Sequence, residues 1–409
     1  MNIVCARMLA KYTMYRRSKD EWGLWTTGES TTAVFVLVRA MRKFPDNVDM
    51  QSCAIAALVA MCSPVAQLES VVGQTDVCQA AAVETHALAL AVTAMRIHGN
   101  SGLHTHVCKL IRLFPDGSTL QVHLHAVLMA ALRYNLSTAH FEGMRHVIRL
   151  LSYLIAEDKI DSGDFVLLAN ASTTILHVLE LLLAHIDTEE PAVAIQNHDT
   201  MQCAAILMNM LCVYQIHIRT VVTIPNATQI VLKCLHESHR LAIAPPPALF
   251  LVNMGVRMDD CYEVQMSLSG VLLEIDACEF REFHTAEAIA ILLDIIKDTE
   301  YSPLQRALCN IIDGVAFHDN DETNLILNAK GLETIACMMR APARPSPNLI
   351  SRILELCLHL AEKCPGYKAA MLQLNFVDLW NAQKQKTISA QKNPSASGEQ
   401  LVAALLQGE

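Results

Sequence analysis

The stretch that decides the fold is Ser302–Phe376, SPLQRALCNIIDGVAFHDNDETNLILNAKGLETIACMMRAPARPSPNLISRILELCLHLAEKCPGYKAAMLQLNF. Ser302 and Pro303 predict a helix start, because serine caps a helix and proline suits its first position. Gly331 is predicted to end a short helix in the left-handed conformation. The proline-rich run 341–347 predicts the end of the next helix. The stretch therefore indicates a long helix, a short one, a medium one and a second long one.

Apolar residues recur along the two long helices at the spacing of one helix face. In each case the apolar arc is too wide for one partner helix to cover, so we expect further helices to be stacked on it. The stripes consist of Leu304, Ala307, Leu308, Ile311, Ile312 and Val315 in the first, and of Ile350, Ile353, Leu354, Cys357 and Ala361 in the second.

The order of a short helix, a glycine, a second helix, a proline-rich turn and a longer third helix resembles an armadillo repeat. The segment Asn324–Leu332, NLILNAKGL, is similar to the junction between the first and second helices of that family. This resemblance, to the armadillo/HEAT-like helical repeats, covers about one full repeat and the third helix of the repeat before it. It implies an all-α fold: a right-handed α-solenoid of armadillo-like three-helix repeats, with HEAT-like irregular repeats as a variant.

The same pattern recurs upstream in windows of eleven residues that align without gaps. Their starts lie 34, 36, 81, 63, 40 and 46 residues apart, and five of them begin with glutamine. Four of these spacings fall in or near the range of about 34–47 residues that is typical of helical repeats. The windows are Gln51–Met61, Thr85–Met95, Gln121–Ala131, Gln202–Cys212, Gln265–Ile275, Gln305–Val315 and Ser351–Ala361.

These spacings predict one solenoid over residues 1–380, with an irregular N-terminal cap over about 1–45. The long gap before the window at Gln265 predicts an irregular insertion over about 216–262. Residues 381–409 are rich in Gln, Lys and Ser, which predicts a loose tail with a short terminal helix. Gly102 and Gly143 are predicted to lie in turns.

Composition narrows the class of protein. The 409 residues are 52% hydrophobic and 18% charged, which excludes disorder for most of the chain. A net charge of −10 argues against a general nucleic-acid binder. No segment is a convincing membrane span and no secretory signal is present. The 14 cysteines lie mostly on apolar helix faces, which predicts reduced thiols and a cytoplasmic location.

Catalytic and cofactor-binding motifs are missing from the sequence. There is no GxxxxGK[ST], GxGxxG, GxSxG or HExxH, so we expect no enzymatic activity and no cofactor. The first alternative is a helical metal protein or enzyme that uses Cys234, His236 and His239. His236 and His239 are three residues apart and would share a helix face, although no CxxC supports a zinc site.

A mitochondrial helical-repeat RNA-binding protein is the second alternative. Its basis is the N-terminus, where Arg7, Lys11, Arg16, Arg17 and Lys19 precede the first acidic residue. The stretch has few serines and a modest density of basic residues, which favours a solvated helix over a targeting sequence. The sequence leaves the question of targeting open.

The leading hypothesis is a non-catalytic scaffold or adaptor that binds another protein, in a stable complex or by self-association. Two sets of polar residues lie opposite the apolar stripes of their helices. Because the third helices of armadillo proteins line a concave groove, the resemblance implies a polar, partly basic strip there. An ordinary solvated helix face is an equal alternative. The strip consists of Arg306, Asn310, Asp313, Arg352, Glu355 and His359.

One departure from the family bears on the partner. Peptide-binding armadillo proteins carry an asparagine at a fixed place on successive third helices. Without it, we expect recognition through side-chain or apolar contacts rather than through a clamped extended backbone. The corresponding positions here are Ala60, Ala94, Ala130, Leu211, Glu274, Gly314 and Leu360.

Overall fold

The computed structural model describes residues 8, 11–12, 27–63, 69–114, 121–156, 165–185, 191–212, 221, 223–224, 226–243, 258–277, 284–299, 301–318, 325–340, 347–363, 365–389 and 396–406. In these ranges all regular structure is helical: there are nineteen helices and no strand. The prediction of an all-α fold is confirmed.

The chain falls into two compact units. Unit 1 comprises Met1–Leu181 and Gln196–Leu207, and unit 2 comprises Leu182–Ile195 and Met208–Glu409. The boundary therefore lies within two helices, α9 (Phe165–Ala184) and α10 (Pro191–Cys212).

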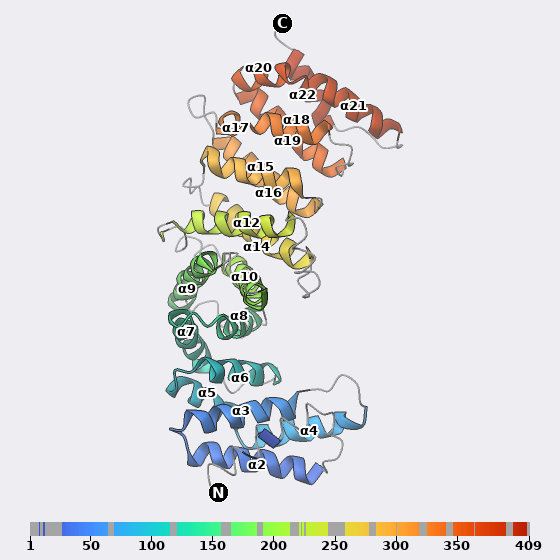
Figure 1. Cartoon of the computed structure of the whole chain (residues 1–409). Helices are drawn as coiled ribbons and strands as arrows, with labels where there is room; N and C mark the ends of the chain where they lie inside the picture. Colours follow the sequence, from blue (N-terminus) through green and yellow to red (C-terminus); the bar gives the residue numbers. More distant parts are fainter. Residues whose placement is uncertain are drawn as a thin grey trace. The chain divides into compact units, whose positions relative to one another are not determined.

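Two rows of successive helices make up most of unit 1 (Figure 1). In one row α3 packs on α6 and α6 packs on α8, and in the other α2 contacts α5 and α5 contacts α7. Helix α4 lies against α2 and α3. The bounds are α2 (Thr27–Lys43), α3 (Val48–Cys62), α4 (Glu69–Glu84), α5 (Ala87–Ile97), α6 (Ser101–Arg112), α7 (Gln121–Ser137) and α8 (Phe141–Ala156).

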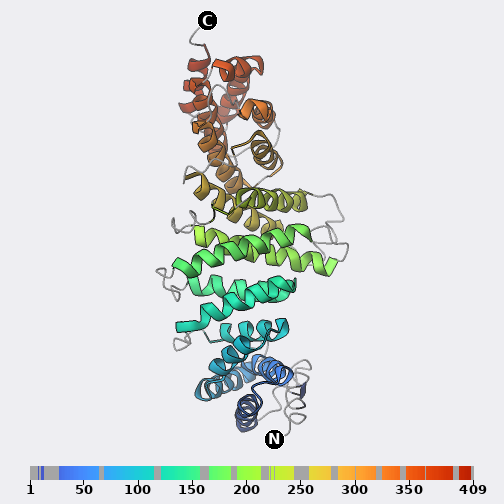
Figure 2. The same ribbon diagram turned by 90° about the vertical axis from the view of Figure 1, so that its left-hand side faces the viewer.

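Unit 2 repeats this arrangement. Helices α14, α16, α19 and α22 contact one another in succession, and α12, α15, α18 and α21 form the second row. The helices coloured yellow to red in Figure 2 follow one another in chain order. The bounds are α12 (Ala227–Ile243), α14 (Met258–Ala277), α15 (Ala286–Asp298), α16 (Ser302–His318), α17 (Leu325–Asn328), α18 (Gly331–Arg340), α19 (Pro347–Lys363), α20 (Pro365–Gln373), α21 (Phe376–Ser389) and α22 (Ala396–Leu406).

The stretch that opened the sequence analysis folds as four helices, α16 to α19. The apolar stripe of α16 is buried: Leu304, Leu308 and Ile311 have no exposed surface. Burial of a side chain of this size stabilises the fold by roughly 1.5–3 kcal/mol. The residue in the left-handed conformation is Lys330, with φ of 54°, and not Gly331. Gly331 instead begins α18, where a Cβ atom would collide with Ile326.

The sequence alignment treats the eleven-residue windows as corresponding helices of successive repeats, and this prediction is only partly correct. Gln51–Met61 lies in α3, whereas Thr85–Met95 and Gln121–Ala131 fall on α5 and α7, which belong to the other row. The helices that follow α3 in its row are α6 and α8. Because nearly every helix here is apolar over a wide arc, the windows align in sequence whichever row a helix occupies.

The glutamine that opens several windows has a structural role. The last four carbonyl groups of a helix lack partners within the helix. Gln51, at 2% exposure, donates from Nε2 to the carbonyl oxygens of Met41 and Phe44, both at 2.9 Å. It therefore caps the end of α2 from the first turn of α3.

Gln305 makes the equivalent contact in unit 2. Its Nε2 donates to the carbonyl oxygen of Ile296 at 3.1 Å and to that of Thr299 at 2.7 Å. Helix α15 is thus capped from the first turn of α16. Gln265 makes a longer contact, 3.4 Å, to the carbonyl oxygen of Ser238 inside α12, which joins α14 to α12 without capping a helix end.

Gly102 and Gly143 lie inside helices and not in turns, which corrects the prediction. Gly102 is in the first turn of α6. Gly143 is in the first turn of α8, where its N–H donates to Nδ1 of His140 at 2.9 Å. A Cβ atom at position 143 would collide with the Asn135 side chain, so close packing accounts for this glycine.

The segment 381–409 contains more regular structure than its composition predicts. Helix α21 continues to Ser389, and α22 packs on α19 and α21. Leu401 and Leu405 of α22 are fully buried, and Gly398 lies directly against the Trp380 ring. The short terminal helix expected from the sequence is thus present as α22, and burial of these apolar residues explains why it packs on the rest of unit 2.

Other predicted irregular segments lie largely outside the described residues. Of the N-terminal basic residues only Lys11 is described, and it is exposed. Helix α2, a regular helix, takes up the end of the predicted cap over residues 1–45. Within the predicted insertion over 216–262, α12 is a regular helix, and the run Pro245–Pro247 is not among the described residues.

Candidate functional site: polar clusters between neighbouring helices

Five of the six predicted strip residues lie together between α16 and α19. Arg352 is the centre of the group. Its Nε donates to Oδ1 of Asn310 at 2.7 Å, its Nη1 to Oε2 of Glu355 at 2.7 Å and its Nη2 to Oδ2 of Asp313 at 3.0 Å. One guanidinium group thus joins two residues of α16 to one of α19. We call Asn310, Asp313, Arg352, Glu355 and His359 the α16–α19 cluster.

His359 completes the α16–α19 cluster. Its Nδ1 lies 3.1 Å from Oδ1 of Asp313, so Asp313 faces both Arg352 and His359. The Asp313 side chain is 18% exposed and that of His359 50%. Salt bridges at this exposure contribute only about 0–1 kcal/mol each. The α16–α19 cluster orders side chains at the surface more than it stabilises the fold.

The charge of the α16–α19 cluster differs from the expected partly basic strip. Arg352 faces two carboxylates, those of Asp313 and Glu355, so one guanidinium stands against two carboxylates in the group. Arg306 is exposed one turn before Asn310 and makes no ion pair with any described residue. Arg306 is therefore the only cation of the predicted strip that the described residues leave uncompensated.

The structure explains the glycine at position 314. The carboxylate of Asp276, in α14, lies where a Cβ atom of residue 314 would be placed. That carboxylate is held by His284, whose Nε2 is 3.1 Å from Asp276 Oδ1, and both side chains are largely buried. An asparagine would not fit at position 314 without displacing Asp276.

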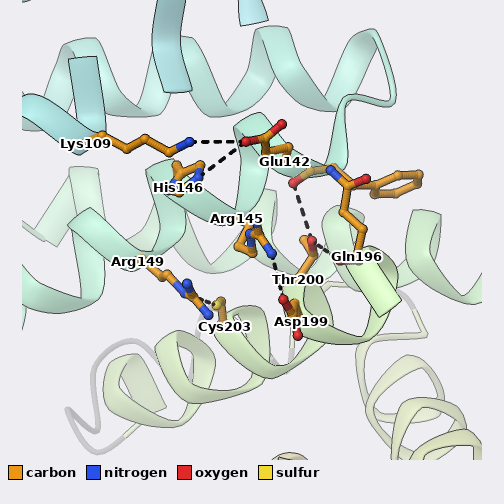
Figure 3. Close-up of polar contacts among 10 residues, drawn as sticks. Lys109, Glu142, Arg145, His146, Arg149, Gln196, Asp199, Thr200 and Cys203 are labelled. Carbon is orange, nitrogen blue, oxygen red and sulfur yellow. Dashed lines mark hydrogen bonds and ion pairs between the residues drawn. The ribbon is translucent and has the colours of Figure 1, made fainter. Parts of the chain in front are cut away.

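A second polar group lies between α6, α8 and α10 of unit 1, and the sequence analysis did not identify it. Figure 3 shows the side chains of α8 between those of the two neighbouring helices. Lys109 Nζ is 3.3 Å from Glu142 Oε1, and Arg145 Nη1 is 2.6 Å from Asp199 Oδ2.

Arg149 extends this group by one turn. Its Nε donates to Sγ of Cys203 at 3.1 Å. We call the whole group the α6–α8–α10 strip; it comprises Lys109, Glu142, Arg145, His146, Arg149, Asp199 and Cys203.

Burial and neighbouring charge set the protonation states in the α6–α8–α10 strip. Burial, together with the nearby charges of Lys109 and Arg145, lowers the pKa of His146 to about 4, so His146 is neutral at pH 7. Burial raises the pKa of Glu142, but the hydrogen bond from Lys109 and the surrounding positive charges outweigh it and leave the pKa below its usual value. Burial raises the pKa of Cys203 although Arg149 opposes this, so Cys203 is a thiol and not a thiolate.

Two features of the sequence could have pointed to the α6–α8–α10 strip. Glu142, Arg145 and Arg149 are spaced i, i+3 and i+7, which places them on one helix face. Asp199 and Cys203 are spaced i and i+4 on α10. The partners Lys109 and Asp199 are 33 and 54 residues away from the α8 residues that they contact, so no local pattern could have paired them.

The three residues of the metal-site alternative do not come together. Cys234 is fully buried, His236 is exposed, and buried His239 points to Asp298, with 3.7 Å between Nε2 and Oδ2. Within the described ranges, no three His, Cys, Asp or Glu side chains form a group that could hold a metal ion.

We also considered membrane-spanning segments. Among the described residues no single helix has both the length and the apolar composition to cross a membrane. Thr75–Glu84 and Ala87–Ile97 meet those two criteria only when they are taken together, as a pair bent by 68°.

Comparison with known proteins gives no family assignment. No protein-family model and no curated protein matches the sequence. Among solved structures, an engineered protein from a structural genomics consortium is 13% identical over 100% of both chains, with a TM-score of 0.46. A structure from work on a phosphorylation switch in the interaction between cadherin and beta-catenin is 14% identical over 100% of this chain and 97% of that one, with a TM-score of 0.30. Both scores are too low to bear on fold, function or partner.

Proposed function

We propose that this protein is a non-catalytic scaffold that binds another protein, and that each of its units is a run of armadillo-like repeats in a right-handed α-solenoid. The order of α17, α18 and α19, followed by α20, α21 and α22, supports the repeat assignment. In each triplet the second and third helices join the two rows of unit 2.

The observation that carries the proposal is the α16–α19 cluster. Two neighbouring helices hold five polar side chains in a fixed arrangement at a partly exposed surface. Side chains that are already ordered lose little conformational entropy when a partner binds. A surface of this kind suits recognition with little rearrangement.

The described cysteines agree with a cytoplasmic scaffold. Eleven cysteines among the described residues are free thiols, and nine of the eleven are buried. Burial raises the pKa of Cys309 and of Cys108 to about 12, so these thiols are unreactive. We propose a reducing compartment, the cytoplasm, as the place where the scaffold acts.

Affinity capture followed by mass spectrometry tests the scaffold function. Arg306→Glu reverses the exposed cation beside the α16–α19 cluster, and Arg352→Gln removes its central guanidinium. Lys297→Glu, exposed on α15 in the other row, is the matched control because it makes the same change of charge as Arg306→Glu. We expect the two cluster variants to lose a partner that wild type and Lys297→Glu retain.

Folding is checked by circular dichroism of each variant, because Arg352→Gln removes three hydrogen bonds. If wild type, Arg306→Glu and Arg352→Gln are all folded and capture the same proteins, this surface is excluded as the binding site. Failure of the full-length chain to capture any protein above background would contradict the scaffold function itself.

A further inference from the structure

The α6–α8–α10 strip is a local excess of positive charge in an acidic protein. Lys109 faces Glu142, Arg145 faces Asp199, and Arg149 faces the uncharged sulfur of Cys203. Arg112, on the turn of α6 after Lys109, is exposed and adds a fourth cation. Among the described residues of this region, four cations therefore stand against two carboxylates, whereas the whole chain has a net charge of −10.

The two histidines of this region do not change that balance at neutral pH. Burial lowers the pKa of both His106 and His146, and nearby Lys109 lowers it further in each case. Both rings are therefore neutral, and the surplus of positive charge is carried by the guanidinium groups and the Lys109 ammonium.

The guanidinium groups have hydrogen-bond donors to spare. A guanidinium has five N–H donors. Arg149 uses Nε on the Cys203 sulfur, and its two terminal nitrogens have no acceptor among the described residues. Arg145 uses Nη1 on Asp199, while its Nε is buried without a partner.

The contact with Cys203 orders Arg149 without neutralising it. A thiol sulfur is a weak acceptor, and burial raises the pKa of Cys203 so that it carries no charge. Arg149 is thus an ordered cation whose two terminal nitrogens are available as donors. Their geometry matches the two oxygens of a carboxylate. Lys109 and Arg145 show the same preference, since each already binds a carboxylate of this chain.

The spacing of the cations fits a polypeptide. They lie on two neighbouring packed helices, and the axes of packed helices are about 8–10 Å apart. In an extended chain, side chains two residues apart point the same way and are separated by about 7 Å. Arg149 lies seven residues, or about 10 Å, along α8 from Glu142, the residue that Lys109 contacts. Acidic residues at every second position present carboxylates on one side at intervals of about 7 Å, so a short acidic segment spans the distance from Lys109 to Arg149.

We propose that the α6–α8–α10 strip binds an acidic segment of the protein partner, with a carboxylate on the free donors of Arg149. This proposal rests on the scaffold function. A surplus of two positive charges suits carboxylates, whereas a nucleic acid would need a larger basic surface. The carboxylates of Glu142 and Asp199 would repel a doubly charged phosphate more than a carboxylate.

Fluorescence anisotropy with the full-length chain tests this assignment. The probe is a fluorescein-labelled peptide of about ten residues that alternates glutamate and serine. We expect it to bind more weakly as salt is raised, and we expect the same peptide with glutamine in place of glutamate not to bind. A phosphoserine peptide and single-stranded DNA are the competing probes. Tighter binding of either than of the glutamate peptide would overturn the proposal.

Three variants locate the binding. Arg149→Gln is expected to weaken binding of the glutamate peptide by at least about tenfold, because charge-assisted hydrogen bonds are lost. Arg133→Gln, exposed on α7 in the other row, is the matched control and should bind as wild type does. Glu142→Gln removes a competing carboxylate and should tighten binding, which a merely destabilised protein would not do.

Unchanged affinity in Arg149→Gln, or an equal loss in Arg133→Gln, would overturn the proposal. Loss of acidic-peptide binding with partner capture intact would refute only this inference. Peptide binding that persists when no protein partner is captured would count against the scaffold function and leave the strip as a carboxylate site.

Discussion

Gln51 and Arg352 each connect two helices through one side chain, but their surroundings differ. Gln51 is 2% exposed and donates to two backbone carbonyls. The Arg352 side chain is 33% exposed, and solvent weakens its ion pairs. We therefore expect changes at Gln51 to affect stability, and changes at Arg352 to affect mainly the chemistry of the surface.

Gln51→Leu should destabilise the protein by about 1–3 kcal/mol, because the carbonyls of Met41 and Phe44 lose their donor while they stay largely buried. Urea denaturation followed by circular dichroism measures the change. Gln373→Leu, exposed at the end of α20, is the control and should stay within about 0.5 kcal/mol of wild type. Equal stability of the two variants would contradict a capping role for Gln51.

Gly314→Ala should cost about 1–3 kcal/mol, because the new methyl group would collide with the Asp276 carboxylate. Gly28→Ala is the matched change in open space, since nothing lies within 4 Å of a Cβ atom there. It should be neutral or stabilising by up to about 1 kcal/mol, as alanine favours a helix over glycine. Thermal melting of both variants gives the comparison, and a stable Gly314→Ala would mean that Asp276 moves freely.

At this scale the sequence predicts which residues share a helix face, but not which faces meet. The spacing of Arg352, Glu355 and His359 placed them correctly on one side of α19. That Arg352 contacts Asn310 and Asp313, 42 and 39 residues earlier, depends on the packing of α16 against α19. Whether these residues bind a partner stays a prediction.

The bounds of a helix were predictable where the sequence has a capping residue, an apolar stripe and a helix-breaking residue in the right order. Ser302 and the proline run 341–347 gave the start of α16 and the end of α18 to within one residue. The row to which a helix belongs was not predictable, because α5 is as apolar as α3 and α7 also buries an apolar face. That error also explains the missed α6–α8–α10 strip, since the windows passed over α6 and α8.

Helix α22 gives a test of how the C-terminal element is held. Leu401→Ala should destabilise the protein by about 2–5 kcal/mol, because Leu401 is fully buried where α22 packs. Loss of α22 packing should also shift Trp380 fluorescence to longer wavelength, since Gly398 lies on its ring. Leu406→Ala, on the same helix but 50% exposed, is the control. Identical melting of the two variants would show that α22 does not contribute to stability.

The whole protein is acidic, with a net charge of −10, and it buries several histidines. Burial lowers the pKa of His104, His146 and His239 in both units. In the unfolded chain each of these histidines has a pKa of about 6.5, and in the folded protein its pKa is lower. Below pH 6.5 the unfolded chain therefore binds more protons than the folded protein does. Stability must therefore fall as the pH drops below about 6.5.

For His146 the loss develops between pH 6.5 and about pH 4 and reaches at most about 3 kcal/mol. Melting temperatures measured across this range should fall with pH in wild type and fall less steeply in His146→Gln. His177→Gln, exposed on α9, should keep the slope of wild type. The same slope in His146→Gln as in wild type would exclude His146 as a source of acid sensitivity.

The glutamine caps also determine where the chain can accept extra residues. Gln51 and Gln305 span the short junctions α2–α3 and α15–α16, and each reaches the carbonyls on the far side of its junction. An insertion there would move the amide out of reach of these carbonyls. The junctions α2–α3 and α15–α16 are therefore expected to tolerate inserted residues less well than a junction without such a cap.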